Sequence, residues 1–577
     1  MHDISSSAGI DHLLPIDNTN ISYNNNGAHM EYRLPLAQQQ HNVAQHPDKI
    51  WLHQPVDRVW HSYTWAEVDD QARRIASGLL ANGLTKGDRV AIIAKNSMEW
   101  FVTDLAIMMA GMISVPIYAT AGIETIQHVI NHSGSKAIFV GKLDDQGPIE
   151  AAMPKDILSI AFPYPTAQCK AQWHDWLQQY EPLQELHEAQ PDDIFTLVYT
   201  SGSTGLPKGV VLTQRNVAAS AYNAATIVDS DGKERGMSYL PLAHITERCV
   251  VELPSFYNPA DVYFVESLDT FIEDLRHARP TNFLSVPRLW TKFQSQILAK
   301  MPNKKLQRLL KIPIIGKLVA KKIRTQLGLQ HATRFGSGTA PIAPDVLRWF
   351  RGIGIDIGEG WGMTETSGLS CGNIPYDPDH LSTIGVTQKC VEMKLSDAGE
   401  ILIRGDAVFK EYYNNPEATS ESFVEGWFRT GDKAKQNADG SWQIIGRVKE
   451  QFKTGKGKYV APVPIESSLG RNTDIEQVCV MGVGRKQPIA ILVLGEGNSK
   501  SQQEIRAELE KTLQEVNSEL ESHQTLDHLI VCDEAWGIDN GLLTPTLKLK
   551  RDKLEERYGH FLTAPLKGKV VWESEAA

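Results

Sequence analysis

The stretch "VYTSGSTGLPKGVVL", from Val198 to Leu212, sets two apolar runs on either side of a loop of Gly, Ser and Thr. The runs "DIFTLVYT" and "GVVL" predict buried strands, and Thr213 predicts the N-cap of a helix that begins near Gln214. Glycines let amide N–H groups converge on an anion, hydroxyls add donors, and a lysine adds positive charge. The loop therefore predicts a polyphosphate site, formed by Thr200, Ser201, Gly202, Ser203, Thr204, Gly205 and Lys208.

The same loop departs from the common phosphate loop of nucleoside triphosphatases. That loop ends in Lys followed by Ser or Thr and opens directly into a helix, whereas Lys208 is followed by Gly209 and a strand. The alternative to a phosphate site is a polar, Gly-rich turn with no ligand. The loop therefore indicates a phosphate-binding class other than the triphosphatases.

Length and composition bound the remaining possibilities. A chain of 577 residues is longer than one core uses, so two or more domains are expected. The net charge of −11 argues against a nucleic-acid-binding scaffold. The six cysteines have no CxxC spacing and are expected to be reduced thiols, as in the cytoplasm.

Two segments near the N-terminus bear on targeting. Residues 1–27 are polar and Asn-rich without the apolar run of a signal peptide, and predict a mobile tail. The most apolar stretch, Leu105 to Tyr118, is shorter than the roughly 20 residues that span a bilayer. It predicts a buried helix that runs into a buried strand.

Pattern changes along the chain predict the fold class. Helical and strand patterns alternate through the first half, which predicts a doubly wound α/β body. Residues 399–405 and 440–447 predict antiparallel strands near the end of that body. After Arg447, a Lys- and Gly-rich loop leads into two strands and a charged helix, a self-sufficient α+β pattern. The predicted divisions are 1–27, 28–446 and 447–577.

Further Gly-rich and charged motifs accompany the opening loop. They are "GSGTAP" (336–341), "GWGMTETSG" (360–368), "GWFRTGD" (426–432), "GRVKEQFKTGKGKYVAP" (446–462) and "TPTLKLKR" (544–551). With the loop, these six motifs resemble the adenylate-forming enzymes, from about Trp51 to Arg551. "LPLAHITERCV" (240–250) and "VPRLW" (286–290) are more similar to the long-chain fatty acyl-CoA synthetases than to the luciferases or peptide-synthetase adenylation domains.

The resemblance implies a fold and a first half-reaction. It implies a large AMP-binding and acyl-binding domain of stacked sheets and helices with a small barrel-like part, followed by a small, mobile α+β domain. A carboxylate attacks the α-phosphate of ATP, pyrophosphate leaves, and metal and cations neutralise the phosphate charge. Carboxylate oxygens suit Mg²⁺. The implied Mg²⁺ residues are Thr204 and Glu365.

By the same resemblance, the other motif residues surround ATP and the reacting carboxylate. Thr364 would lie on the α-phosphate and Asp432 on the ribose hydroxyls. Trp361 stands where the family commonly has Tyr, and would stack on adenine. Lys548 would bridge the carboxylate and the α-phosphate, with Lys550 as the alternative register. The other implied nucleotide or reaction residues are Gly338, Thr339, Gly362, Arg447, Lys208 and His244, the last with a core histidine as the alternative.

The second half-reaction uses the segment after Arg447. The resemblance implies that the small domain rotates about Lys449 after adenylation, so that Lys548 leaves. The loop Lys453–Tyr459, with Gly455 and Gly457, then enters and shapes a tunnel for CoA. Glycine suits a position where a thiol-bearing arm passes close to the backbone.

Several functions stay open at this point. The first is ATP-dependent formation of acyl-CoA from a long-chain fatty acid. The alternatives are an acyl-AMP ligase that loads a carrier protein, a CoA ligase for another hydrophobic carboxylate, and a non-catalytic relative. A non-catalytic relative is expected to lose Lys548, Glu365 or Asp432, and all three are present. The oligomeric state is open, with a homodimer as one possibility.

One basic segment has no place in the chemistry. Residues 304–324, "KKLQRLLKIPIIGKLVAKKIR", hold eight Lys and Arg and no acidic residue. Apolar residues at helical spacing predict two short helices separated at Pro313. Basic amphipathic helices lie on anionic membranes, so the segment predicts a peripheral docking site. The alternative is a pair of surface helices packed on the core.

Overall fold

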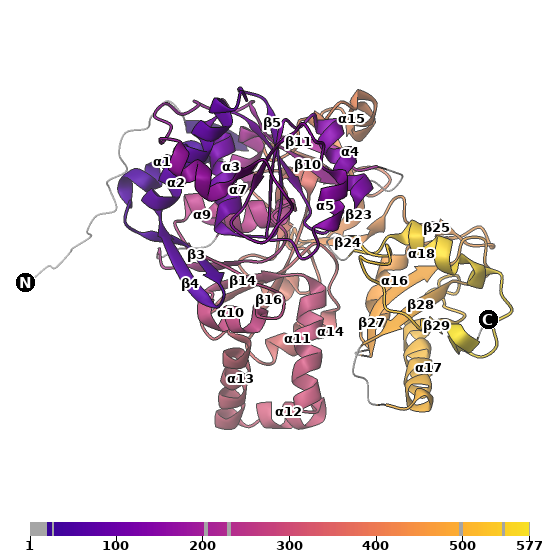
Figure 1. Cartoon of the computed structure of the whole chain (residues 1–577). Coiled ribbons are helices and arrows are strands. Elements are labelled where there is room, and N and C mark those ends of the chain that lie inside the picture. Colours follow the sequence, from indigo (N-terminus) through magenta and orange to yellow (C-terminus); the bar gives the residue numbers. More distant parts are fainter. Residues whose placement is uncertain are drawn as a thin grey trace, which may run out of the picture.

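The large and small parts of the molecule are distinct in Figure 1, with an α/β body (indigo to light orange) beside a smaller α+β part (orange to yellow). This arrangement confirms the predicted fold class. The computed structural model describes residues 20–25, 28–200, 206–227, 232–472, 474–495, 500–544 and 548–575. In this described portion, no helix combines the length and hydrophobicity needed to cross a bilayer.

An eight-stranded sheet forms the centre of the α/β body. Its strand order is β21-β11-β10-β6-β5-β7-β8-β9. The strands from β6 to β9 run parallel, while β10 and β11 form an antiparallel pair that holds the ends of the Gly-rich loop. The bounds are β5 (Arg89–Ala94), β6 (Ile113–Ile117), β7 (Ala137–Gly141), β8 (Leu158–Ala161), β9 (Ala171–Gln172), β10 (Ile194–Thr200), β11 (Lys208–Thr213) and β21 (Glu411–Tyr412).

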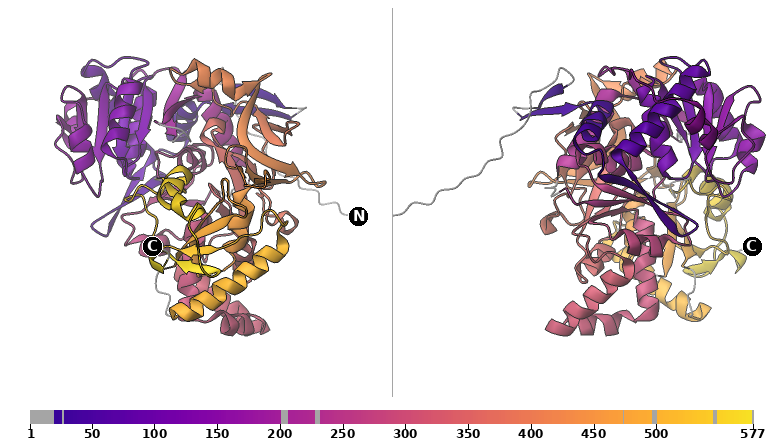
Figure 2. Two further views of the ribbon diagram at one scale, coloured as in Figure 1. Left: turned by 90° about the vertical axis from the view of Figure 1, so that its right-hand side faces the viewer. Right: turned by 60° about the vertical axis from the view of Figure 1, so that its left-hand side comes forward.

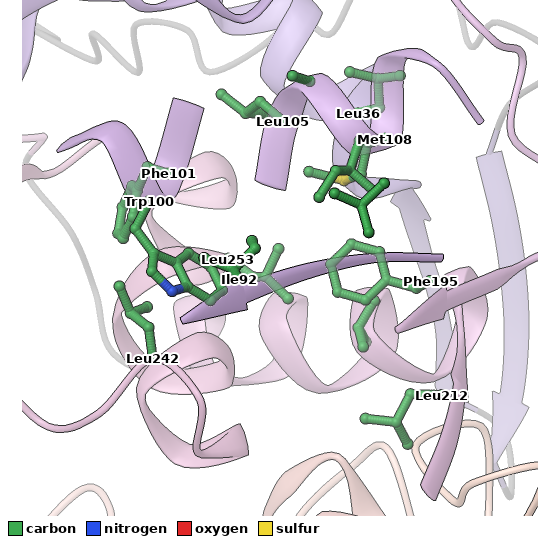
Figure 3. Close-up of a cluster of buried hydrophobic side chains, with 14 of the residues drawn as sticks. Leu36, Ile92, Trp100, Phe101, Leu105, Met108, Phe195, Leu212, Leu242 and Leu253 are labelled. Atoms are coloured by element: carbon green, nitrogen blue, oxygen red, sulfur yellow. The ribbon is translucent and has the colours of Figure 1, made fainter. Parts of the chain in front are cut away.

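Helices cover both faces of this sheet. Ile92 of β5 packs in one hydrophobic cluster with Trp100 and Phe195 (Figure 3), and the next residue, Ile93, packs in another with Ile126. Successive strand residues point to opposite faces, so both faces are buried, as the doubly wound pattern predicts. One face is covered by α2 (Trp65–Ala81), α3 (Met98–Met109) and α7 (Gln214–Thr226), and the other by α4 (Ile123–Ser133) and α5 (Gly147–Ala152).

Two local predictions from the sequence are confirmed here. The apolar stretch at 105–118 is buried helix α3 followed by buried strand β6. Thr213 caps α7, because its hydroxyl accepts from the amide of Asn216 at 3.3 Å while the Asn216 side chain accepts from the amide of Thr213 at 2.8 Å. The helix therefore starts at Gln214, where the cap placed it.

A second sheet and its helices form the lower half of the body in Figure 1. Its order is β14-β15-β16-β17-β18, with β14 to β16 parallel. A separate hydrophobic cluster packs on it through Trp290 and Phe350. The bounds are β14 (Asn282–Ser285), β15 (Arg334–Ser337), β16 (Ile357–Met363), β17 (Gly368–Gly372), β18 (Val386–Thr387), α10 (Phe271–Ala278), α11 (Pro287–Lys300), α12 (Asn303–Leu310), α13 (Pro313–Leu327) and α14 (Pro344–Arg351).

Smaller sheets complete the body. One has the order β12-β13-β3-β4, and one is an antiparallel sheet in which β24 pairs with β23, as predicted for residues 399–405 and 440–447. The bounds are β3 (Ile50–Val56), β4 (Val59–Thr64), β12 (Arg235–Ser238), β13 (Asp261–Phe264), β19 (Glu392–Leu395), β20 (Glu400–Arg404), β22 (Phe423–Val424), β23 (Trp427–Gln436) and β24 (Trp442–Arg447).

The C-terminal part has its own sheet and core. The sheet order is β27-β28-β29-β30, and hydrophobic clusters lie on its two faces. The hairpin of β25 and β26 contains the Lys- and Gly-rich segment, since Lys453 pairs with Tyr459. The bounds are β25 (Phe452–Lys453), β26 (Tyr459–Val460), α16 (Pro462–Leu469), β27 (Ile475–Met481), β28 (Ile489–Leu494), α17 (Gln502–Glu519), β29 (Leu529–Val531), α18 (Arg551–Tyr558) and β30 (Val570–Trp572).

The predicted N-terminal tail includes a short strand at its end. β1 (Asn20–Asn25) pairs antiparallel with β2 (Ala28–Arg33), with Asn20 opposite Arg33. In "NISYNN", Ile21 and Tyr23 alternate with polar residues, which is the period of a strand. The polar composition outweighed this short alternation in the prediction. The rest of the predicted tail, 1–19 and 26–27, lies outside the described residues.

Candidate active site

One continuous cleft runs between the α/β body and the C-terminal part. Most of the sequence-predicted site residues line it, although they come from separate elements of both parts. Those that line it are Thr200, Lys208, His244, Gly338, Thr339, Trp361, Gly362, Thr364, Glu365, Asp432, Arg447, Lys449, Lys453 and Lys548. The predicted loop residues Ser201, Gly202, Ser203, Thr204 and Gly205 lie outside the described residues.

The described ends of the Gly-rich loop are held in fixed register. Thr200 of β10 is the strand partner of Lys208 of β11. The ring of His128 lies 2.9 Å from the carbonyl oxygen of Pro207, through its Nε2 atom. Thr200, Pro207 and Lys208 all line the cleft. The two strands therefore deliver both ends of the predicted phosphate loop to the cleft wall.

Glu365 is oriented by a tyrosine that also contacts Lys208. The buried Glu365 lies in a short 3-10 turn with Thr364, and its Oε1 accepts from the hydroxyl of Tyr412 at 2.8 Å. The ammonium of Lys208 lies 5.0 Å from the centre of the Tyr412 ring, a cation–π contact. The carboxylate, the tyrosine and the lysine thus form one connected group from β16–β17, β21 and β11.

Asp432 binds two cleft residues at once. Its Oδ2 accepts from Nε1 of Trp361 at 2.9 Å, and its Oδ1 accepts from Nε of Arg447 at 2.6 Å. Asp432 and Arg447 are also register partners on β23 and β24. Each carboxylate oxygen has a second lone-pair direction, so the group can still accept from a ligand. The indole N–H of Trp361 makes a polar contact that no phenyl ring would make.

Backbone conformation shapes the wall near this carboxylate. Thr339 has φ of 70°, in the left-handed region, and follows Gly338 at the end of β15. At Gly362, a Cβ atom would lie 1.5 Å from the carbonyl oxygen of Gly368, so only glycine lets β16 and β17 approach. These two positions therefore fix the path of the backbone where the motifs cross the cleft wall.

His244 is the N-cap of a short helix at the cleft. Its Nδ1 accepts from the amide of Thr246 at 3.2 Å, so in the neutral ring the proton resides on Nε2. Burial, together with the charge of Lys548, lowers the pKa of His244 to about 3. The ring is therefore neutral at physiological pH and offers an N–H donor rather than a charge.

Lys548 lines the cleft together with residues of the body, and its side chain is exposed to solvent there. Burial and the nearby charge of Arg447 lower its pKa, while Asp432 and Glu365 act in the opposite direction. Lys550 also lines the cleft, and it occupies the N-cap position of α18. The structure thus brings Lys548 of the C-terminal part beside the carboxylates of the body.

The segment between the two parts is short. The exposed Lys449 directly follows the amide of Val448, which donates to the carbonyl of Gly431 at 2.8 Å. On its other side, Glu450 accepts from Nε of Arg551 at 3.1 Å, and Arg551 also pairs with Glu466 at 2.6 Å. The bonds therefore fix the backbone up to Val448 and the side chain of Glu450.

The predicted CoA loop lies mostly away from the cleft. Its two ends, Lys453 and Tyr459, line the cleft, but Gly455 and Gly457 do not. A Cβ atom on Gly455 would lie 2.6 Å from the carbonyl oxygen of Gly484, so this glycine permits close packing within the C-terminal part. Gly457 has φ of 77° with open space around it. The arrangement therefore places Lys548, and not the glycines of the loop, at the cleft.

The contact between the two parts includes an ion pair whose two residues both line the cleft. Nη2 of Arg288, at the start of α11, lies 2.8 Å from Oε1 of Glu476 on β27. In the described chain, it is the single ion pair that joins the body to the residues after Lys449.

Sequence reasoning missed two further cleft residues. Tyr412 lies in "EYYNN", where no motif marks it. Glu359 of β16 is half-buried, and its Oε2 atom is buried with no hydrogen-bond partner among the described residues. Its strand neighbour Ser337 likewise has a buried, unpartnered hydroxyl, and both line the cleft. Buried polar atoms without partners are uncommon, so this pair is where a polar ligand edge would be satisfied.

We expect Tyr412→Phe to lower the affinity of the site for Mg²⁺, so that exchange needs a higher Mg²⁺ concentration. The change keeps the ring that contacts Lys208 and removes the hydroxyl that orients Glu365. Loss of such an orienting partner typically costs about 10- to 100-fold in metal affinity or activity. ATP–pyrophosphate exchange measured against Mg²⁺ concentration checks this. Tyr413→Phe is the matched control, and equal Mg²⁺ curves for both variants would contradict the assignment.

Glu359 is expected to make stability depend on pH. Burial raises its pKa from 4.5 to about 8. The folded state then holds a proton that the unfolded chain releases, so stability is lost as the pH rises from about 4.5 to 8, by on the order of a few kcal/mol. Thermal unfolding at several pH values should show a smaller decline for Glu359→Gln than for wild type. Equal declines of stability with pH in wild type and Glu359→Gln would refute this role of Glu359. The pKa of Glu247 is also raised by burial, but it cancels in the difference.

An α/β body whose cleft receives a lysine from a small C-terminal α+β part is the architecture of the adenylate-forming class. The family model described as AMP-binding enzyme matches residues 39–413, and the model of the AMP-binding enzyme C-terminal domain matches residues 450–560. The chain belongs to the AMP-binding enzyme family.

Named relatives cover nearly the whole chain. A fatty acyl-CoA synthetase A of Dictyostelium discoideum is 32% identical, over 87% of this chain and 85% of its own. A long-chain-fatty-acid–CoA ligase of Mycobacterium bovis is 29% identical, over 90% and 94%. The adenylation domain of a carboxylate reductase from Mycobacterium chelonae has a TM-score of 0.79 at 22% identity, covering 92% of this chain and 90% of that one. This last likeness concerns the fold alone.

Proposed function

We propose that this enzyme activates a long-chain fatty acid with ATP and transfers the acyl group to CoA, releasing AMP and pyrophosphate. The observation that carries the proposal is Lys548 of the C-terminal part in one cleft with Glu365 and Asp432. The fatty acyl-CoA synthetase and the long-chain-fatty-acid–CoA ligase named above support the substrate class.

In the first half-reaction, a carboxylate oxygen attacks the α-phosphorus and the bond to the β-phosphate oxygen breaks. Negative charge collects on the α-phosphate oxygens as the carboxylate approaches. The ammonium of Lys548 stabilises that charge from between the two reactants. Neutral His244 donates from Nε2 without adding a charge of its own. Thr364, beside Glu365, supplies a hydroxyl to the same phosphate.

The residues present fit a Mg²⁺ ion held mainly by phosphate oxygens. In the described portion of the chain, no cluster of three or more His, Cys, Asp or Glu side chains forms a closed metal site. Mg²⁺ commonly uses only one or two carboxylates with substrate phosphates, and the buried, oriented Glu365 is such a group. When bound, the ion would neutralise phosphate charge.

The nucleoside is assigned to the wall around Asp432. Its carboxylate, held by Arg447 and Trp361, would accept from the ribose hydroxyls, as acidic residues do in dinucleotide sites. The face of the Trp361 indole, Gly338, Thr339 and Gly362 would receive the adenine.

In the second half-reaction, we propose that the C-terminal part rotates about Lys449. Lys548 then leaves the cleft, and the hairpin from Lys453 to Tyr459 enters it. The CoA thiolate attacks the acyl carbon, the bond to the AMP oxygen breaks, and AMP leaves. The present arrangement, with Lys548 in the cleft and Gly457 outside it, corresponds to the first half-reaction.

A fatty-acid panel scored by CoA-dependent AMP release tests the proposed function. Long-chain acids should give the highest kcat/KM, with stoichiometric acyl-CoA. Release that needs holo-carrier protein instead of CoA would overturn the acceptor, and preference for aromatic or short acids would overturn the substrate class.

Long-chain acids partition into bilayers, so we also propose a cytoplasmic enzyme that works at a membrane surface. Sedimentation would decide between a monomer and a homodimer.

A further inference from the structure

The helical hairpin of α12 and α13 protrudes from the body at the end opposite the eight-stranded sheet (Figure 1). Both views of Figure 2 place it at the lower extremity of the molecule. The predicted break falls where expected, because α12 ends at Leu310 and Pro313 is the first residue of α13. A docking element needs such a position, clear of the rest of the chain.

The hairpin is anchored on one side only. Leu306, Ala320 and Ile323 are buried in the cluster of the second sheet. Nη1 of Arg324 donates to the carbonyl of Ile353 at 2.6 Å, which ties α13 to the body. The core-packing alternative is therefore correct for the inner face of the hairpin. It does not account for the outer face.

The corner between the helices is rigid. A Cβ atom on Gly316 would lie 2.3 Å from the carbonyl oxygen of Leu310, so the first turn of α13 packs directly on the end of α12. The amide of Gly316 also donates to the carbonyl of Ile312 at 2.7 Å. The side chains on the outer side of this corner are thus held outward by the backbone.

Those side chains are large and apolar. Ile312 is 44% exposed, Ile314 76%, Ile315 44% and Leu318 62%, all within seven residues. A cluster of exposed large apolar residues, rimmed by polar ones, is typical of a surface that binds a partner or a membrane.

The rim of this cluster is strongly basic. In the described chain, none of the hairpin cations forms an ion pair with a carboxylate. The whole chain has a net charge of −11, so the hairpin is a positive patch on an acidic protein. The cations are Lys304, Lys305, Arg308, Lys311, Lys317, Lys321, Lys322 and Arg324.

We propose that the outer face of the α12–α13 hairpin docks the enzyme on an anionic lipid bilayer. Ile312, Ile314, Ile315 and Leu318 would enter the boundary between headgroups and acyl chains, and the lysines would contact the anionic headgroups. A second copy of the hairpin is a poor partner for this face, because it would bring its eight cations against the eight cations of the first copy. A soluble polyanion would leave the apolar corner in water.

The hairpin also lies next to the active-site cleft. Helix α11 runs from Arg288 to the base of the hairpin, and its residues Leu298 and Ala299, followed by Asn303 of α12, line the cleft. A fatty acid drawn from the bilayer would meet the cleft beside the docked surface. This step of the inference rests on the proposed function, whereas the docking itself does not.

Flotation of the full chain with phosphatidylcholine vesicles, with or without phosphatidylglycerol, tests the proposal. Salt near about 0.05 M and about 0.5 M is compared, because the higher concentration shortens the screening length severalfold. The charge variant is Lys317→Glu with Lys321→Glu and Lys322→Glu, which leaves Arg324 and its bond to the body intact. The control with the same net charge is Lys155→Glu with Lys511→Glu and Lys567→Glu, exposed positions on other elements. The apolar variant is Ile314→Ser with Leu318→Ser.

Wild type and the control should float with anionic vesicles at low salt, and high salt should release most of the protein. The charge variant and the apolar variant should each lose at least about tenfold in vesicle-bound fraction, since the two signals act together. No flotation of wild type, equal flotation with neutral vesicles, or flotation of the charge variant equal to wild type would overturn the proposal.

Ligase activity with octanoate in vesicle-free buffer separates this test from that of the proposed function. Unchanged activity in the charge variant shows that it is folded. A protein that floats as expected but ligates no fatty acid would retain the docking surface and refute the proposed reaction. A protein that ligates fatty acids but never floats would retain the proposed reaction and refute the docking surface.

Discussion

Replacing Lys548 with alanine is expected to lower fatty-acid-dependent ATP–pyrophosphate exchange by about 10²- to 10³-fold, the usual loss when one well-placed charge-stabilising group is removed. The lysine lies in the cleft with Asp432 and Glu365, where the α-phosphate is assigned. The exchange assay reports the first half-reaction alone because it needs no CoA.

Lys550→Ala is the matched control for this prediction. It removes the same charge two residues away, from the N-cap position of α18. We expect exchange within about threefold of wild type, as for ordinary surface changes. If instead Lys548→Ala stays within that margin and Lys550→Ala does not, the other register is the correct one.

Gly457→Leu is expected to separate the two half-reactions. A Cβ atom at this position has only the Cε of Lys453 nearby, at 3.9 Å, so the arrangement described above has room for a side chain to begin there. After rotation, the same side chain would stand where the thiol arm of CoA passes. Acyl-AMP should form and stay bound while acyl-CoA output falls by about 10²-fold, as for a misplaced reactant.

Gly457→Ala separates the obstruction from backbone strain. Gly457 has φ of 77°, and any L-residue there costs about 1–2 kcal/mol. Alanine carries this cost with little bulk, so its acyl-CoA output should stay close to that of wild type. Quench-flow measurement of acyl-AMP and acyl-CoA gives both rates. Equal loss of both half-reactions in the leucine variant would remove the loop from the CoA path.

The elements that could be predicted from the sequence are those with a local physical cause. The hydroxyl of Thr213 satisfies amides within its own helix, so the start of α7 could be placed without tertiary information. Lys548 could be named because its motif is long and specific. Tyr412 could not, because its importance depends on Glu365, which lies 47 residues away in the sequence. A buried carboxylate oxygen without a partner, such as Oε2 of Glu359, likewise exists only once the strands are assembled.

The basic hairpin shows the same limit in a different form. Helical spacing alone assigned all nine Leu, Ile and Val residues of this segment to one face. Packing divides them, since Leu306 and Ile323 are buried while Ile314 and Leu318 are exposed. The inner set stabilises the fold, and only the outer set is available to a membrane. That division depends on the position of the second sheet, about which residues 304–324 carry no information.

The contact between Arg288 and Glu476 bears on when the C-terminal part changes its orientation between the two half-reactions. The pair is partly exposed, and such pairs contribute about 0–1 kcal/mol, less when salt screens them. If the C-terminal part rotates about Lys449 as proposed, an ion pair this weak adds little to the barrier or to the preference for either orientation. A ligand that prefers one orientation by about 1.4 kcal/mol then changes the ratio of the two orientations tenfold. The ligand in the cleft, ATP before adenylation and acyl-AMP after it, would then determine when the C-terminal part changes its orientation.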